Sequence, residues 1–203
     1  MIHELWQAHL TFALLAFLIL PNFGLSPSRQ CLLLLGLLAI GAIPVAGLPL
    51  AAYLRSFTDD LAITTLVALL FATLLRLRMV AGLGDVQREQ ILLLFAILAL
   101  FLYPATLGLT LLDPYRLGYS PRALLLVIGA LALLLLWLRN GVAAIMLGAA
   151  TLAFSLELKP STNYWDYLLD PLLALYCWVA VLSKTAAALF GHLRKQRPTM
   201  RSE

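Results

Sequence analysis

Charged and chemically reactive side chains are scarce in this chain. Of 203 residues, 12% are charged, three are histidine and two are cysteine. Cys31 and Cys177 lie in apolar runs with neither a CxxC neighbour nor a histidine partner, so we interpret both as small buried hydrophobic residues. The sequence also lacks a G-x-S-x-G motif, a P-loop and a histidine cluster. We therefore expect no metal and no cofactor.

Apolar residues dominate what remains. They make up 63% of the chain, and the mean hydropathy of +0.95 is far above that of soluble domains. The net charge of +4 does not indicate nucleic-acid binding, because the basic residues lie at the ends of the apolar runs and in the C-terminal tail. The composition predicts a polytopic membrane protein.

Seven apolar runs are each close to the length of about 20 residues that a spanning helix needs. They predict an all-α transmembrane bundle of about seven spans, with residues 1–193 as one domain and 194–203 as a basic cytoplasmic tail. The first run is the weakest, and the joint at Arg139, Asn140 and Gly141 is so tight that the runs on either side of it must form an antiparallel hairpin. The runs cover residues 5–21, 31–54, 61–77, 91–112, 123–138, 141–158 and 167–190.

The distribution of Lys and Arg predicts the orientation, because cytoplasmic loops carry an excess of both. The predicted cytoplasmic side holds Arg29, Arg76, Arg78, Arg88, Arg139, Arg194, Lys195, Arg197 and Arg201, with Lys184 nearby. The other side holds Arg55, Arg116, Arg122 and Lys159. An odd number of spans then places the N-terminus outside and the C-terminus in the cytoplasm. Short loops and the absence of sorting segments indicate a multi-pass protein of the bacterial inner membrane.

Acidic and aromatic residues gather on the predicted outer side. Acids have little influence on topology, so the orientation rule does not account for this asymmetry. The acids predicted outside are Glu4, Asp59, Asp60, Asp113, Glu157, Asp166 and Asp170, against Asp85, Glu89 and Glu203 inside. Six of the seven tyrosines also lie at the outer interface. The outer surface is therefore the expected working face.

Three outer segments supply the candidate binding residues. The first covers residues 55–60, where Thr58 or Asp59 is expected to cap the following helix. The second covers residues 113–122, and the third covers residues 161–171, where Asp170 before Pro171 is a good helix start. The candidate binding residues are Arg55, Asp59, Asp60, Asp113, Tyr115, Arg116, Tyr119, Arg122, Trp165, Asp166 and Asp170.

Two interpretations of these segments stay open. Their charges can form a structural ion-pair network that ties the loops together, or they can build a binding or catalytic site. In either case we expect Arg55, Arg116 or Arg122 to pair with an acid from another outer segment, because unpaired charges are costly beside lipid. Helix capping explains Asp170 but does not easily explain Asp166, which makes Asp166 the strongest indication of a site.

The favoured hypothesis is a non-catalytic subunit or scaffold of the cell envelope, whose outer loops bind a membrane lipid head group or an envelope protein. One alternative is a membrane enzyme acting on a lipid or lipid-linked substrate at the outer leaflet. In this alternative the outer carboxylates supply acid-base or metal-ligand groups, and Arg116 or Arg122 holds an anion. A second alternative is a small transporter, although no ionisable residue lies at the centre of any predicted span.

Overall fold

The chain folds almost entirely into helices in a computed structural model that describes residues 5–109 and 111–196. The described residues form α1 (Trp6–Ile19), α2 (Pro27–Gly41), β1 (Pro44–Val45), β2 (Leu48–Pro49), α3 (Leu50–Thr58), α4 (Ile63–Arg76), α5 (Asp85–Thr106), the 3-10 helix η2 (Pro114–Gly118), α6 (Arg122–Trp137), α7 (Gly141–Ser155), α8 (Trp165–Leu168) and α9 (Pro171–Gln196). The predicted all-α class is confirmed. Part of the predicted charge asymmetry rests on residues outside the described ones, namely Glu4, Arg197, Arg201 and Glu203.

Two helices are long and apolar enough to cross a membrane. They are α5, with 22 residues, and the 20-residue stretch Pro171–Phe190 of α9. The helices α1, α2, α4, α6 and α7 are apolar but have 14 to 16 residues each, below the length that an untilted span needs. The structure is compatible with membrane association and does not confirm seven spans.

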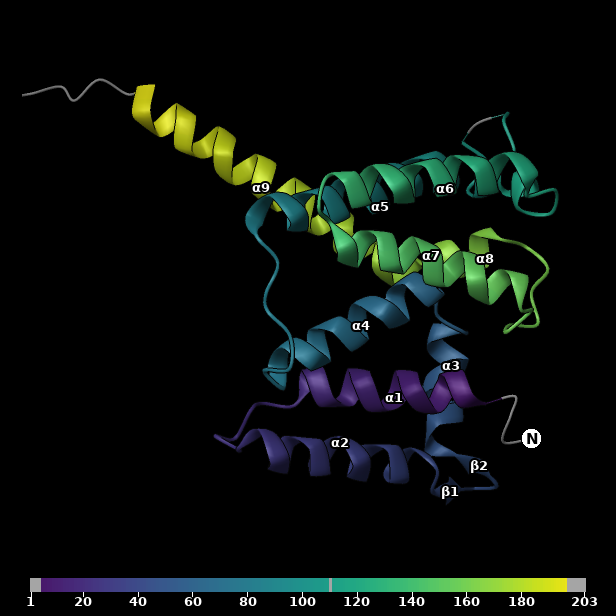
Figure 1. The fold of residues 1–203 in the computed structure, drawn as a ribbon, viewed down its shortest axis with the longest axis vertical. Helices are drawn as coiled ribbons and strands as arrows, with labels where there is room; N and C mark the ends of the chain where they lie inside the picture. Colours follow the sequence, from purple (N-terminus) through teal and green to yellow (C-terminus); the bar gives the residue numbers. More distant parts are fainter. Residues whose placement is uncertain (1–4, 110, 197–203) are drawn as a thin grey trace, which may run out of the picture.

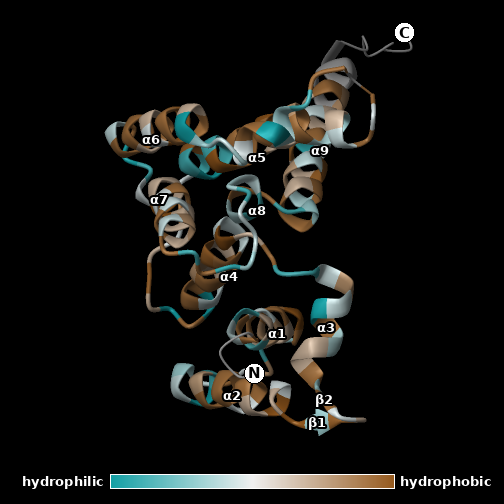
Figure 2. Cartoon of the chain, turned by 90° about the vertical axis from the view of Figure 1, so that its right-hand side faces the viewer, coloured by the Kyte–Doolittle hydropathy of each residue, from teal (hydrophilic) through white to brown (hydrophobic). Residues whose placement is uncertain are grey.

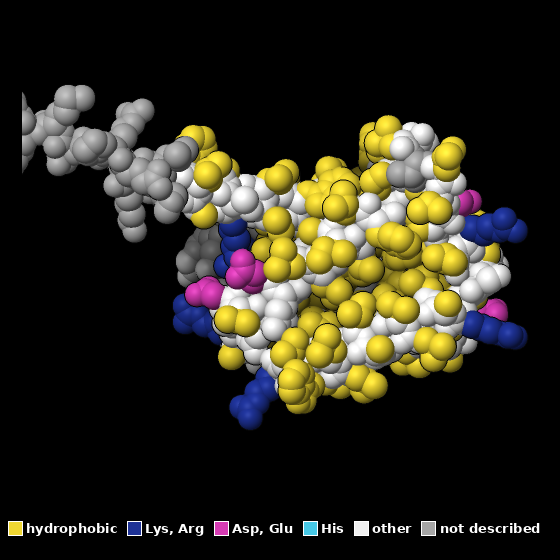
Figure 3. All heavy atoms as spheres, turned by 90° about the horizontal axis from the view of Figure 1, so that it is seen from above, with side chains coloured by type: hydrophobic (Ala, Val, Ile, Leu, Met, Phe, Trp, Pro, Cys, Tyr) yellow, Lys and Arg dark blue, Asp and Glu magenta, His cyan; other side chains and the backbone are white. Residues whose placement is uncertain are grey.

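The apolar helices run side by side and their connections alternate between two ends of the molecule (Figure 1). One end carries β1, β2, α3, η2 and α8, and is called the α3 end below. The opposite end carries the connections between α1 and α2, α4 and α5, and α6 and α7. The helices are mainly hydrophobic in colour (Figure 2), and on the face seen in Figure 3 charged side chains lie at the two ends with an apolar zone between them.

The second predicted span, residues 31–54, is wrong. Helix α2 ends at Gly41, and the chain then makes a two-stranded antiparallel hairpin in which Pro44 lies opposite Pro49. Proline cannot donate a backbone hydrogen bond to a helix, and Gly47 adopts a positive φ of 88°, so the apolar run cannot continue as one helix. The remainder forms α3, which lies steeply inclined to α1 and α2 at the α3 end (Figure 1).

The predicted hairpin of residues 123–138 and 141–158 is present as α6 and α7, which pack along each other. Arg139 takes a positive φ of 58° at the turn, and the Asn140 side chain accepts a hydrogen bond from the Ala143 amide at 3.2 Å. Asn140 is fully buried, and its Nδ2 donates to the Gln87 carbonyl and to Gln90 Oε1, both at 2.9 Å. The joint thereby fixes α5 against the start of α7.

Two apolar clusters hold the helices together. The larger cluster contains residues of every α-helix from α4 through α9, among them Phe95, Ile128 and Leu147. The smaller cluster joins α1 and α2 around Phe17. Arg76, at the end of α4, connects them: its guanidinium donates to the carbonyls of Phe17 and Leu20 and lies 4.3 Å from the centre of the Phe17 ring. These bonds satisfy carbonyls that the end of α1 leaves without helical partners.

Candidate functional site

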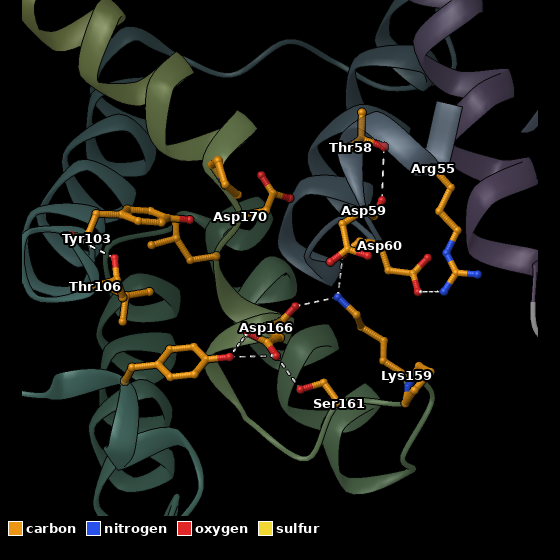
Figure 4. Close-up of a pocket in the computed structure, with 15 residues that line it drawn as sticks. Arg55, Thr58, Asp59, Asp60, Tyr103, Thr106, Lys159, Ser161, Asp166 and Asp170 are labelled. Atoms are coloured by element: carbon orange, nitrogen blue, oxygen red, sulfur yellow. Dashed lines mark hydrogen bonds and ion pairs between the residues drawn. The ribbon is translucent and has the colours of Figure 1, made fainter. Parts of the chain in front are cut away.

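A polar cavity of about 420 Å³ opens at the α3 end. Its walls come from the end of α3, the end of α5, η2, the start of α9 and the segment 159–170, here called the α7–α9 segment (Figure 4). The lining residues are Arg55, Thr58, Asp59, Asp60, Leu102, Tyr103, Thr106, Tyr115, Lys159, Pro160, Ser161, Asp166, Leu169, Asp170 and Pro171. The three predicted outer segments therefore meet around one cavity.

Arg55 and Asp60 form an ion pair, with Arg55 Nη2 at 2.6 Å from Asp60 Oδ2, and it is the one ion pair found among the described residues. Both residues belong to the same outer segment, so the predicted ion pair between different segments is wrong. Asp59 ends α3 with a positive φ of 56°, and its side chain is exposed at the cavity (Figure 4). The pair orients Arg55 along the cavity wall and leaves the Asp59 carboxylate accessible.

Lys159 connects the segments in place of the expected ion pair. Its side chain is buried, and Nζ donates to the carbonyls of Asp60 at 2.8 Å, Leu61 at 3.1 Å and Asp166 at 2.7 Å. Three acceptors match the three N–H bonds of an ammonium group. Burial lowers the pKa of Lys159 from its ordinary value, and the negative charge of Asp166, the largest opposing influence, raises it.

Asp166 is half-buried and is held by hydroxyl groups. Tyr115 donates its hydroxyl to the two carboxylate oxygens at 3.0 and 3.2 Å, and the Ser161 hydroxyl donates to Oδ2. Burial, together with the hydrogen bond to Asp166, raises the pKa of the Tyr115 hydroxyl above its ordinary value. No cation takes part in the described hydrogen bonds of this carboxylate, so Asp166 presents a negative charge to the cavity.

Asp170 has the structural role that its place before Pro171 predicted. One carboxylate oxygen accepts from the Leu173 amide at 2.8 Å, which caps the start of α9. The other accepts from the Ala62 amide at 2.8 Å, just before α4 begins. Asp170 therefore serves two helix starts, and the expectation that Thr58 or Asp59 caps the helix after α3 is wrong.

The aromatic residues of the α7–α9 segment are buried rather than exposed. Trp165 is 1% exposed and donates its indole N–H to the Pro114 carbonyl at 2.9 Å, so it anchors η2 instead of facing the cavity. Asn163 donates to the Tyr115 carbonyl at 3.1 Å. Gly118 lies so close to these residues that a Cβ atom there would lie 1.7 Å from Asn163 Oδ1. These contacts position Tyr115 against Asp166.

Four other predicted residues lie away from the cavity lining. Asp113 accepts from the Arg116 amide at 3.3 Å and begins η2, and Tyr119 packs edge-on against Tyr115 with ring centres 5.7 Å apart. Arg116 and Arg122 are exposed and do not line the cavity. The structure thus brings together Arg55, Asp59, Asp60, Tyr115, Asp166 and Asp170, and it uses Trp165 as a support.

The candidate binding residues selected from the sequence omit five polar residues that line the cavity, namely Thr58, Tyr103, Thr106, Lys159 and Ser161. Tyr103 and Thr106 lie one turn apart at the end of α5, and Tyr103 is one of the six tyrosines predicted at the outer interface. The sequence could have indicated Lys159 as a site residue, because it is the basic residue nearest in sequence to Asp166 among those predicted outside. Its target, however, is a set of backbone carbonyls that residue types cannot reveal.

No group of three or more His, Cys, Asp or Glu side chains arranged to hold a metal ion occurs within residues 5–109 and 111–196. No protein-family model, curated protein or solved structure matches this chain.

Proposed function

We propose that this chain is a multi-pass protein of the bacterial inner membrane whose cavity at the α3 end binds the head group of a membrane lipid without catalysis. In this proposal α1, α2, α4, α5, α6, α7 and α9 cross the membrane, the α3 end faces outward and the C-terminus is cytoplasmic. The short helices would be matched by local bilayer thinning and by interfacial side chains. The alternating connections of Figure 1, with Arg76, Arg78, Arg88 and Arg139 at the end opposite α3, support this orientation.

The charge balance of the cavity carries the proposal for its ligand. Four aspartates and two basic side chains line it, so carboxylates outnumber cations. Asp60 is paired with Arg55, Asp170 accepts from two backbone amides, and Lys159 is occupied by three carbonyls. The carboxylates of Asp166 and Asp59 accept no hydrogen bond from a cation among the described residues, and the charge of the nearby Lys159 ammonium is shared by all four aspartates. A head group that carries an amine supplies the missing positive charge.

The aromatic and basic residues extend this match. The Tyr103 side chain reaches the cavity from the side opposite Arg55 and Lys159 (Figure 4), and Tyr115 lines the same cavity. Tyrosine rings favour a nearby ammonium group through their negative faces. Arg55 can hold the phosphate of a zwitterionic head group while it keeps Asp60 as a partner, because guanidinium has five N–H donors. The proposed ligand is therefore a zwitterionic lipid of the ethanolamine type.

The topology is tested by cysteine labelling in intact cells. A Ser161→Cys variant is expected to react with a membrane-impermeant maleimide added outside, and the unmodified chain, with Cys31 and Cys177 only, is the control. A reporter that is active only in the cytoplasm and is fused after Arg201 is expected to be active. Labelling of residue 161 only after the cells are lysed would contradict the orientation.

The head-group site is tested with glycerophosphoethanolamine, which lacks acyl chains and reaches the cavity from water. Calorimetry with the purified protein is expected to show saturable binding that weakens at least about tenfold in Asp166→Asn, because the substitution removes the carboxylate charge proposed to contact the amine of the ligand. Asp113→Asn is the matched control, since Asp113 lies outside the cavity. Equal binding by wild type and Asp166→Asn would refute the proposed role of Asp166.

A further inference from the structure

An apolar groove lies beside the polar cavity, between α1, α4 and α7. It has a volume of about 290 Å³, and Leu10, Leu66, Leu70, Ala149 and Leu152 are among the residues that line it. Ala149 and Ala153 keep the α7 side of the groove open, since neither side chain extends past Cβ. The groove therefore offers a long apolar contact surface on the side of the helix bundle.

A third cavity shares lining residues with both the groove and the polar cavity. It has a volume of about 470 Å³ and shares Trp6 and Leu158 with the groove. The same cavity shares Arg55, Asp60, Lys159 and Pro160 with the polar cavity. The lining thus changes along one path from apolar residues on the side of α4 and α7, through Trp6, to charged residues at the α3 end.

We infer that this path is the binding site of one whole lipid, with the head group in the polar cavity and an acyl chain in the groove between α1, α4 and α7. This inference rests on the proposed function and adds the position of the chain and the direction of entry. The lining residues that the cavities share support this inference. The lining changes from apolar to charged along the path, and a lipid changes from an apolar chain to a charged head group along its length.

The dimensions of the groove agree with an acyl chain. Its α4 wall runs from Ile63 to Leu70, which is about 10 Å at about 1.5 Å rise per residue. One leaflet of the hydrocarbon core is about 15 Å deep. The groove can therefore hold most of one acyl chain on its way into the bilayer. Trp6, 38% exposed at the junction, lies where an indole ring favours the boundary between head groups and chains.

The geometry also points to lateral entry from the membrane. The groove lies along the sides of the helices and not at the α3 end, which faces water in the proposed orientation. Leu70 and Leu152 on its two walls are 43% and 60% exposed. A lipid in the outer leaflet can slide its chain along α4 and α7 while its head group passes Trp6 and Lys159. Release of the whole lipid into water is not required.

The test uses proteoliposomes containing a phosphatidylethanolamine with a photoactivatable diazirine in its acyl chain. Crosslinks are expected on α1, α4 and α7 around the groove, and unlabelled phosphatidylethanolamine should compete for them. Ala149→Phe fills the groove. Leu152→Trp also fills it, and it should destabilise the folded protein less because Leu152 is exposed. Each is expected to reduce groove crosslinking about tenfold, because the chain loses contact for two or more methylene groups.

The matched control is Ala130→Phe on α6, an exposed alanine that lines none of the cavities described above. It should leave groove crosslinking unchanged. Glycerophosphoethanolamine binding should also survive Ala149→Phe and Leu152→Trp, since that ligand has no acyl chain. Crosslinks spread evenly over the apolar surface, or unchanged by both groove variants, would overturn the inference and leave the head-group site standing. Failure of glycerophosphoethanolamine to bind the wild-type protein would overturn both.

Discussion

Lys159→Met is expected to be the most damaging single substitution on the cavity wall. The ammonium group of Lys159 donates to three backbone carbonyls, two from the chain between α3 and α4 and one from Asp166. Methionine preserves much of the apolar stem and removes the donor. The substitution therefore tests whether one buried ammonium group holds the α7–α9 segment against the start of α4.

The magnitude follows from the contacts. Hydrogen bonds that involve a charged group contribute about 1.5–3 kcal/mol each. Burial of the ammonium group, which lowers the pKa of Lys159, opposes part of this gain, and water from the cavity can reach the freed carbonyls. The expected loss in the free energy of unfolding is about 2–4 kcal/mol, smaller than the sum of three bonds.

The assay is reversible unfolding of the purified protein in mixed micelles, followed by tryptophan fluorescence. Trp165 lies in the α7–α9 segment and is buried, so loosening of this segment should also shift its emission. Lys184→Met is the control, because Lys184 is an exposed residue of α9 and should change stability by less than about 0.5 kcal/mol. A Lys159→Met variant as stable as Lys184→Met would refute the structural role given to Lys159.

Three further substitutions test other parts of the structure. Gly118→Ala should destabilise the protein by more than about 2 kcal/mol in the same unfolding assay, because the added Cβ atom would clash with the α7–α9 segment. The control is Gly129→Ala, which has open space around the added Cβ atom and should be neutral or slightly stabilising. Equal effects of the two substitutions would contradict the packing described for Gly118. Arg76→Met should lower stability by about 2–3 kcal/mol through loss of the bonds that end α1, and unchanged protection of the α1 amides in hydrogen exchange would contradict that role. The raised pKa of Tyr115 favours the folded state fully below pH 10 and progressively less as the pH rises through the folded pKa. Tyr115→Phe should therefore reduce the loss of stability above pH 10, and an identical high-pH profile would exclude this contribution.

Composition and charge predict a large part of the fold. The apolar runs at 5–21, 61–77, 123–138 and 141–158 correspond to α1, α4, α6 and α7. Each of these runs is bounded by polar or basic residues, so its ends are set locally. The run at 31–54 fails because hydropathy does not register the loss of a backbone donor at two prolines, which turns the chain into a hairpin and then into α3.

The candidate site is predicted as a region, and its internal contacts are not. Charge asymmetry and aromatic clustering select the α3 end of the molecule, where the polar cavity lies. The position of Asp170 before Pro171 predicts its cap on α9. Residue types alone do not reveal that Asp170 also accepts from the Ala62 amide, or that Trp165 bonds to the Pro114 carbonyl. Both contacts join a side chain to a distant backbone group, which leaves no pattern in the sequence.

Retention of lipid through gentle purification tests the central claim most directly. Native mass spectrometry would compare wild-type protein and Asp166→Asn, each reconstituted with equal amounts of phosphatidylethanolamine and phosphatidylglycerol and then released from detergent. The proposed site predicts one phosphatidylethanolamine retained in preference to phosphatidylglycerol by the wild-type protein, and loss of that preference in Asp166→Asn. Equal retention of the two lipids by the wild-type protein, or a preference for phosphatidylglycerol, would contradict it.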